Sequence, residues 1–169
     1  MKLSSLEAIV RSLNEASVPF VVVDGLAVVA HGYGRQTRYL DLVIRLDPDT
    51  IRAAFRALGS LGYQPRVPVT ADAFADPQQR GRWIQEKGMR VLNFHSDRLR
   101  ETPVDIFVSE PFDFGVEYAS AIVEQIAPGV SVRILRLETL LRLKQEAGRP
   151  QDLADIAELK LIHQEDQDA

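Results

Sequence analysis

The sequence contains no cysteine, which excludes disulfide bonds, thiolate zinc sites and cysteine nucleophiles. It also lacks any apolar run of about eighteen residues, the length a helix needs to cross a bilayer. The segment from Met1 to Ser17 is amphipathic and has neither the apolar centre nor the cleavage site of a signal peptide. We therefore expect a cytoplasmic protein with no membrane partner.

The sequence also has no large excess of positive or negative charge. The 20 Lys and Arg against 24 Asp and Glu give a net charge of -4, so the whole protein does not attract nucleic acid or anionic membranes. What the sequence does have is a hydrophobic content of 46% over 169 residues, which is usual for a globular protein. That amount is sufficient for the core of one globular domain.

Hydrophobic periodicity predicts alternating helices and strands without a strict βαβ repeat. This order favours an α+β fold, a mixed sheet with helices on one face followed by a C-terminal helical pair. The segment 116–126 fits a helix or a strand, and 70–87 fits one or two short helices. The other expected helices are 3–13, 25–31, 48–58, 137–147 and 150–163, and the expected strands are 20–23, 40–46, 89–96, 102–109 and 130–137, with a short strand or turn at 61–63.

Two aspartates and a helix start suggest a common site. The strand "FVVV" runs into Asp24 and Gly25 at a helix start, where free backbone amides can receive a phosphate. Asp41 lies on the strand "LDLVI" and Asp105 on the strand "VDIF". If those strands are neighbours, the two carboxylates form a plausible site for magnesium and a triphosphate.

Four blocks of the sequence resemble the nucleotidyltransferase superfamily, and within it the small AbiEii-type and related antitoxin-partner proteins. The motif of that family is a Gly-Gly or Gly-Ser turn, a short helix, Asp-x-Asp on the next strand and a third Asp on a later strand. The tail block is more specific to this branch than any single carboxylate. The matching blocks are "GLAVVAHGYGRQTR", "LDLVI", "VDIF" and "LETLLRLKQEAGRPQDLADIAEL".

The resemblance implies transfer of a nucleoside monophosphate from a nucleoside triphosphate to a hydroxyl of RNA, protein or a small molecule. In such proteins the three Asp hold two magnesium ions while the glycine turn approaches the triphosphate. Carried over, Asp41 is the second Asp and Asp105 the third, both catalytic and metal-binding, and Gly25 belongs to the turn. The resemblance also implies a core over 1–136 with the tail 137–169 packed on it as one compact unit, and it implies toxin–antitoxin or phage-defence contexts for many members.

The sequence departs from the family motif at two positions. Tyr39 stands where the first Asp belongs, and a neutral tyrosine is a poor magnesium ligand. Asp24 stands where the first Gly belongs, adding a Cβ and a negative charge beside the phosphate position. Asp24 is also a candidate for a relocated metal ligand. The alternatives are therefore an active enzyme, a catalytically inactive binding or regulatory module with a partner protein, and a plain interaction domain.

Further candidates have structural interpretations beside the functional ones. Arg35, Thr37 and Arg38 precede the strand and fit either triphosphate contacts or ordinary loop positions. The resemblance places Lys144 near the nucleotide, whereas a solvated helix lysine would have the same sequence pattern. For three other residues the structural interpretation is preferred: a packed, hydrogen-bonded core histidine for His31, and helix-dipole partners at the start of the last helix for Asp152 and Asp155.

Overall fold

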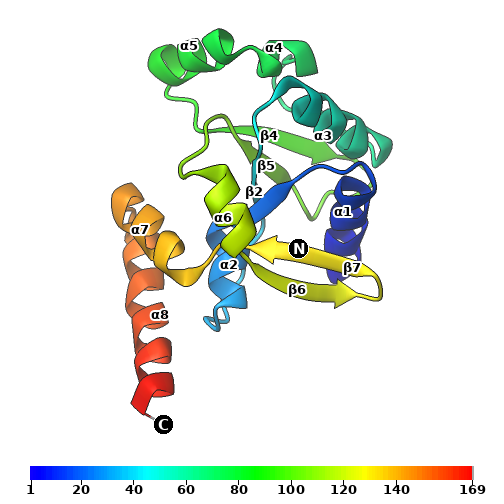
Figure 1. The fold of residues 1–169 in the computed structure, drawn as a ribbon. Helices are drawn as coiled ribbons and strands as arrows, with labels where there is room; N and C mark the ends of the chain where they lie inside the picture. The colour runs from blue at the N-terminus through cyan, green and yellow to red at the C-terminus, as the bar shows by residue number, and fades with distance from the viewer. Residues whose placement is uncertain (169) are drawn as a thin grey trace.

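A mixed β-sheet forms the centre of the molecule, and the computed structural model describes residues 1–168 of the chain (Figure 1). The strand order is β3-β4-β5-β2-β1-β7-β6. β1 pairs parallel with β7 and β2 pairs parallel with β5, whereas the other neighbours are antiparallel. The strands are β1 (Phe20–Val23), β2 (Leu40–Ile44), β3 (Tyr63–Pro65), β4 (Val91–Ser96), β5 (Val104–Phe107), β6 (Ile122–Ala127) and β7 (Val130–Ile134).

One face of this sheet is entirely apolar at its centre. The strand registers align Leu92, Ile106, Leu42, Val22 and Ile134 in one row across five neighbouring strands. Each of these side chains is buried, and burying one aliphatic side chain contributes about 1.5–3 kcal/mol. Because side chains alternate along a strand, the residues between them point to the opposite face, which carries the polar site described below.

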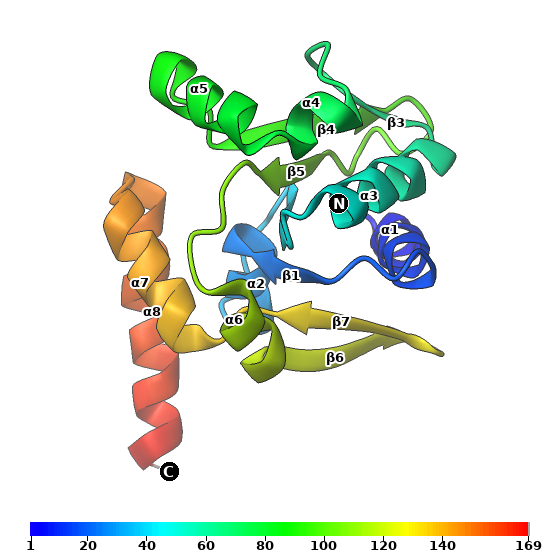
Figure 2. The same ribbon diagram turned by 45° about the horizontal axis from the view of Figure 1, so that its top comes forward.

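Helices α1 (Leu3–Glu15) and α3 (Pro48–Ser60) cover the apolar face side by side (Figure 2). The Phe55 ring of α3 packs edge-on against Phe94 of β4, with 5.1 Å between ring centroids. Ser12 of α1 donates a hydrogen bond to the carbonyl of Ala57, 3.0 Å away. The predicted start of α3 is confirmed, because the Asp47 side chain accepts a hydrogen bond from the Thr50 amide.

The uncertain segment 70–87 forms two short helices, α4 (Ala71–Ala75) and α5 (Pro77–Lys87). Phe74 of α4 is fully buried and packs on Phe55 of α3. Trp83 of α5 stacks on Phe74 with 6.5 Å between ring centroids. The tryptophan therefore anchors a surface helix to the core.

The expected α+β class is confirmed, but the expectation of helices on one face needs a correction. Helix α6 (Phe114–Ser120) lies on the opposite face, where Arg45 lies over the Phe114 ring and Arg133 over the Tyr118 ring. The ambiguous segment 116–126 is divided, because its first half belongs to α6 and its second half to the edge strand β6.

The C-terminal helices stand side by side at one end of the sheet, next to α2 (Asp24–Ala30) (Figures 1 and 2). α7 (Leu137–Ala147) ends at Gly148, whose φ of +61° favours glycine, and α8 (Pro150–Asp168) starts two residues later. His31, after α2, is buried and its Nε2 lies 2.7 Å from the Leu135 carbonyl, which confirms the packed histidine. The division at residue 136 stays a prediction, and Ala169 of the expected tail lies outside the described residues. Over residues 1–168, no helix is both long and apolar enough to cross a membrane.

Candidate active site

The predicted carboxylate pair is present on the polar face of the sheet. Asp41 of β2 and Asp105 of β5 are register partners on neighbouring parallel strands, so their side chains point to the same face. Val23 of β1 is the register partner of Asp41 on the other side, and Asp24 follows it directly. The fold therefore brings together three candidate aspartates from distant segments of the sequence.

Two adjoining clefts open at these carboxylates. The first has a volume of about 330 Å³ and lies between the sheet and α7. The second has a volume of about 420 Å³ and lies against the loop that precedes β2. Both clefts are lined by Asp24, Asp41, Asp105, Arg149 and Asp152. A ligand that occupies both would therefore extend across the carboxylate pair.

Asp41 has an unusual electrostatic environment. Burial, together with the neighbouring carboxylates of Asp24 and Asp105, raises its pKa to about 7. Burial also raises the pKa of Asp105, although a hydrogen bond donated by the Asn93 side chain opposes this shift. Within the described part of the chain, no cationic side chain forms an ion pair with Asp41 or Asp105. Two adjacent carboxylates of this kind favour uptake of a proton or of a cation with oxygen ligands.

Asp24 adopts a backbone conformation that favours glycine. Its φ is +51°, in the left-handed region, where a residue with a Cβ is strained. Its carboxylate is held by two cations: Oδ1 lies 2.7 Å from Lys144 Nζ, and Oδ2 lies 3.2 Å from Arg149 Nη2. These ion pairs offset the strain, and they occupy both oxygens of the candidate relocated ligand.

Lys144 is the centre of a buried ion network. Its Nζ lies 2.7 Å from Asp24 Oδ1, 3.0 Å from Asp152 Oδ1 and 2.7 Å from Asp155 Oδ2, and the side chain is only 3% exposed. The interpretation as a solvated helix lysine is therefore wrong. Burial lowers the pKa of Lys144, but hydrogen bonds to Asp155 and Asp24 outweigh it and raise the pKa overall, so the ammonium stays charged.

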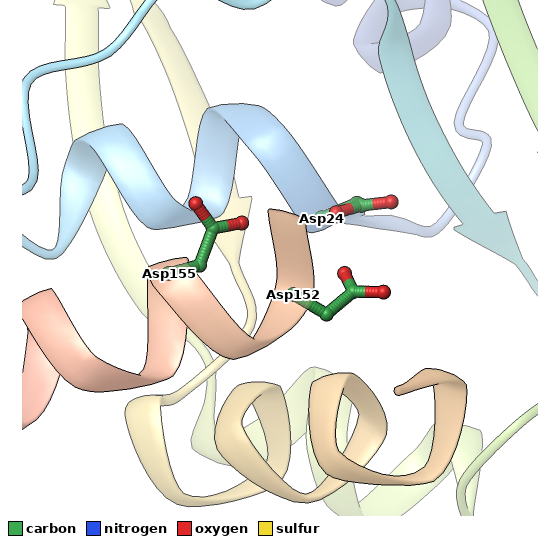
Figure 3. A group of neighbouring side chains, drawn as sticks. All are labelled: Asp24, Asp152 and Asp155. Atoms are coloured by element: carbon green, nitrogen blue, oxygen red, sulfur yellow. The ribbon is translucent and has the colours of Figure 1, made fainter. Parts of the chain in front are cut away.

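Asp152 and Asp155 do more than complement a helix dipole. Both are buried on the first turns of α8 and turn toward the start of α2, where Asp24 lies (Figure 3). Together with Asp24, they offer oxygens within 4.8 Å of one another, a spacing that suits a metal ion. The Lys144 ammonium contacts all three residues, so this cluster already holds a cation of the protein.

The loop before β2 packs tightly on the start of α2. A Cβ added to Gly25 would lie 2.5 Å from Thr37 Oγ1, which explains the glycine. Arg35 forms an ion pair with Asp155, which also contacts Lys144, since the Arg35 Nε lies 2.7 Å from Asp155 Oδ1. Arg38 is exposed and lines the second cleft together with Tyr39, which is 43% exposed. Of the predicted phosphate-binding side chains, Arg38 is therefore the one most free to meet a ligand.

Arg149 is a site residue that the sequence did not indicate. Its guanidinium contacts Asp152 through Nε at 2.6 Å and through Nη2 at 3.0 Å, and it contacts Asp24 as well. The spacing of three residues between Arg149 and Asp152 could have indicated their pairing at the start of α8. Nothing local could have indicated the contact with Asp24, which is 125 positions away in the sequence.

Comparison with known protein families and with curated proteins assigns neither a family nor a function. No protein-family model matches the chain, and no curated protein matches it. The function proposed below therefore rests on the sequence motifs and on the geometry of the site.

Proposed function

We propose that this chain is a nucleotidyltransferase-type protein that transfers a nucleoside monophosphate from a nucleoside triphosphate to an RNA or protein hydroxyl, with magnesium. The observation that carries the proposal is the register pairing of Asp41 with Asp105 in a cleft, with no cationic partner among the described residues. A structural role alone gives no reason to place two carboxylates side by side in a partly buried position, because their repulsion costs stability.

The residues present fit magnesium. Asp41 and Asp105 offer carboxylate oxygens, the ligands that magnesium prefers, and they would hold the ion between the two clefts. When bound, magnesium would neutralise charge on the triphosphate and favour attack on the α-phosphorus. Asn93 fixes Asp105 by donating a hydrogen bond to its Oδ1, so this ligand is preorganised.

The two clefts offer different chemistry for the rest of the substrate. The second cleft presents Arg38, Thr37 and Arg149, whose donors suit phosphate oxygens. The first cleft presents an apolar wall from Phe107, Leu140 and Leu143. An apolar wall suits a nucleobase, so we assign the phosphates to the second cleft and the base to the apolar side of the first.

A second candidate function, a catalytically inactive binding or regulatory module with a partner protein, has its own support. Tyr39 occupies the position of the first motif Asp, and both oxygens of Asp24 are engaged by Lys144 and Arg149. Asp41 and Asp105 then provide two carboxylates where the family motif has three. This candidate predicts nucleotide binding without transfer.

The first test is a calorimetric titration with each of the four ribonucleoside triphosphates, first with magnesium and then with a chelator. We expect magnesium-dependent binding that Asp41→Asn weakens by about tenfold or more, because one ligand charge is lost. Asp97→Asn is the matched control, since Asp97 is exposed and lines neither cleft. If no triphosphate binds under either condition, the proposal is overturned.

A second measurement separates the two candidates. Triphosphates labelled at the α-phosphate are incubated with the protein, magnesium and either RNA or protein acceptors. Label transfer that Asp41→Asn abolishes supports the enzyme. Magnesium-dependent binding with no transfer to any acceptor supports the binding module.

A further inference from the structure

Arg149 lies at the junction of the two clefts. Its side chain is 59% exposed although it contacts two carboxylates, and it lines both clefts. Pro150, the first residue of α8, follows it directly and restricts the backbone there. The guanidinium is thus presented from a fixed point beside the carboxylate pair.

The other two cations of the network are committed to the protein interior. Lys144 is 3% exposed and contacts three carboxylates, and Arg35 is 19% exposed and pairs with the fully buried Asp155. Moving Lys144 would remove an ion pair from three carboxylates, and moving Arg35 would remove one from the fully buried Asp155, which is costly. Arg149 is therefore the member of this network that can turn toward a ligand.

The network would survive that movement. Asp152 would keep Lys144 Nζ at Oδ1, 3.0 Å away, and the Arg149 backbone amide at Oδ2, 3.2 Å away. Asp24 would keep Lys144 at Oδ1, while its Oδ2 would lose the guanidinium. That oxygen belongs to the residue directly after Val23, the register partner of Asp41.

We infer that Arg149 binds the phosphate chain of the nucleotide and that its guanidinium leaves Asp24 for the phosphate when it does so. The inference rests on the proposed function for the identity of its ligand, a nucleoside polyphosphate. The planar guanidinium matches two phosphate oxygens at once, which an ammonium does not. The exchange frees Asp24 Oδ2 beside Asp41 and Asp105, so phosphate binding supplies an oxygen ligand that Tyr39 does not.

The probe for the first part is inorganic tripolyphosphate, titrated by calorimetry in the presence of a chelator. The unmodified protein binds it, and Arg149→Ala lowers the affinity about tenfold to a hundredfold, the range for one charge-assisted hydrogen-bonding group. Arg149→Lys keeps the positive charge but not the planar guanidinium, and it gives an intermediate loss of affinity. Arg142→Ala, which removes an exposed α7 arginine that lines neither cleft, leaves the affinity unchanged.

Thermal unfolding of each variant controls for folding, and if Arg149→Ala does not fold, Arg149→Lys carries the comparison. Absence of tripolyphosphate binding to the unmodified protein overturns the inference. So does equal affinity in the unmodified protein and the Arg149 variants.

The exchange itself is tested with Asp24→Asn, which removes the carboxylate that competes for the guanidinium. This variant binds tripolyphosphate several-fold more tightly than the unmodified protein, and the gain disappears in the Arg149→Ala background. Such a double-mutant cycle separates an effect through Arg149 from a general loss of negative charge. An equal gain in both backgrounds shows that no exchange takes place.

The inference and the proposed function fail in different ways. If magnesium-dependent triphosphate binding requires Asp41 but not Arg149, the proposed function stands and the inference is wrong. If tripolyphosphate binding requires Arg149 but magnesium adds no nucleotide binding through Asp41, the phosphate-binding part of the inference stands and the proposed function is wrong.

Discussion

Lys144 Nζ lies 2.7 Å from Asp24 Oδ1, and this contact joins α7 to the start of α2. The same ammonium reaches Asp155 Oδ2 on α8 at 2.7 Å, so one side chain connects three helices. With Arg35 and Arg149, the network matches three carboxylates with three cations. It fixes α7 and α8 against the end of the sheet where the two clefts lie, and so determines the shape of the site.

Removing Lys144 should destabilise the fold strongly. In Lys144→Ala, three carboxylates lose a shared partner, and breaking a buried ion pair typically costs about 3–5 kcal/mol. Denaturant unfolding followed by circular dichroism measures the change in the free energy of unfolding. Lys160→Ala on the exposed side of α8 is the control. A loss below about 1 kcal/mol, as for exposed ion pairs, would contradict the role assigned to Lys144.

The sheet and most helices could be predicted because their signals are local. Phe20–Val23 is a continuous apolar run after a proline, and Asp47 followed by Pro48 marks a helix start. The segment 116–126 could not be assigned, because α6 gives way to β6 within it and each half is too short to establish a period.

The candidate site was predicted only in part, for a related reason. Asp41 and Asp105 lie on strands whose pattern and resemblance placed them together, and the structure pairs them. The contacts of Lys144 with Asp24 and of Arg149 with Asp24 span 120 and 125 positions, and the sequence carries no periodic signal for such contacts. Asp152 and Asp155 satisfied a local rule at a helix start, and that local explanation concealed their long-range role.

Gly25 should not tolerate a side chain. In Gly25→Ala the new Cβ would lie 2.5 Å from Thr37 Oγ1, so the loop before β2 must move away from α2. Overpacking of this kind costs about 1–3 kcal/mol, and the displaced loop should weaken triphosphate binding in the second cleft. Gly34→Ala is a matched control, because a Cβ there meets nothing within 4 Å. Denaturant unfolding measures the stability of each variant, and calorimetry measures its affinity for triphosphate. Equal stability and equal affinity in the two alanine variants would refute the prediction.

Asp41 should make stability depend on pH. Its pKa is about 7 in the folded protein against an unperturbed value of 3.8, so between these values the folded state binds more protons than the unfolded state. The contribution of Asp41 to the free energy of unfolding therefore decreases as the pH rises from about 4 to 7. The Asp41→Asn variant has no carboxyl group to titrate at this position. Its free energy of unfolding, relative to that of the unmodified protein, should therefore rise by roughly 1–3 kcal/mol from the lower to the upper end of that pH range. Urea unfolding at several pH values with a chelator measures it, and a constant difference would contradict the assigned cause.

Tyr39→Asp should strengthen magnesium-dependent nucleotide binding. Tyr39 lies two residues before Asp41 and lines the second cleft with it, so a carboxylate there would join Asp41 and Asp105. The side chain is 43% exposed, and its replacement should cost little stability. We expect triphosphate affinity in magnesium to rise about tenfold, with no gain in a chelator, because the added ligand acts only through the cation.

Combining Tyr39→Asp with Asp24→Gly tests the whole motif. Glycine relieves the φ of +51° at position 24, but it also removes one partner each from Lys144 and Arg149. The pair should lose some stability, but its magnesium-dependent affinity should exceed that of Asp24→Gly alone, because the carboxylate at position 39 is a ligand that Asp24→Gly lacks. Tyr39→Phe is the control, since it keeps the ring and adds no ligand. If Tyr39→Asp binds magnesium and nucleotide no better than Tyr39→Phe, position 39 does not face the metal, and the correspondence between this corner and the nucleotidyltransferase motif is wrong.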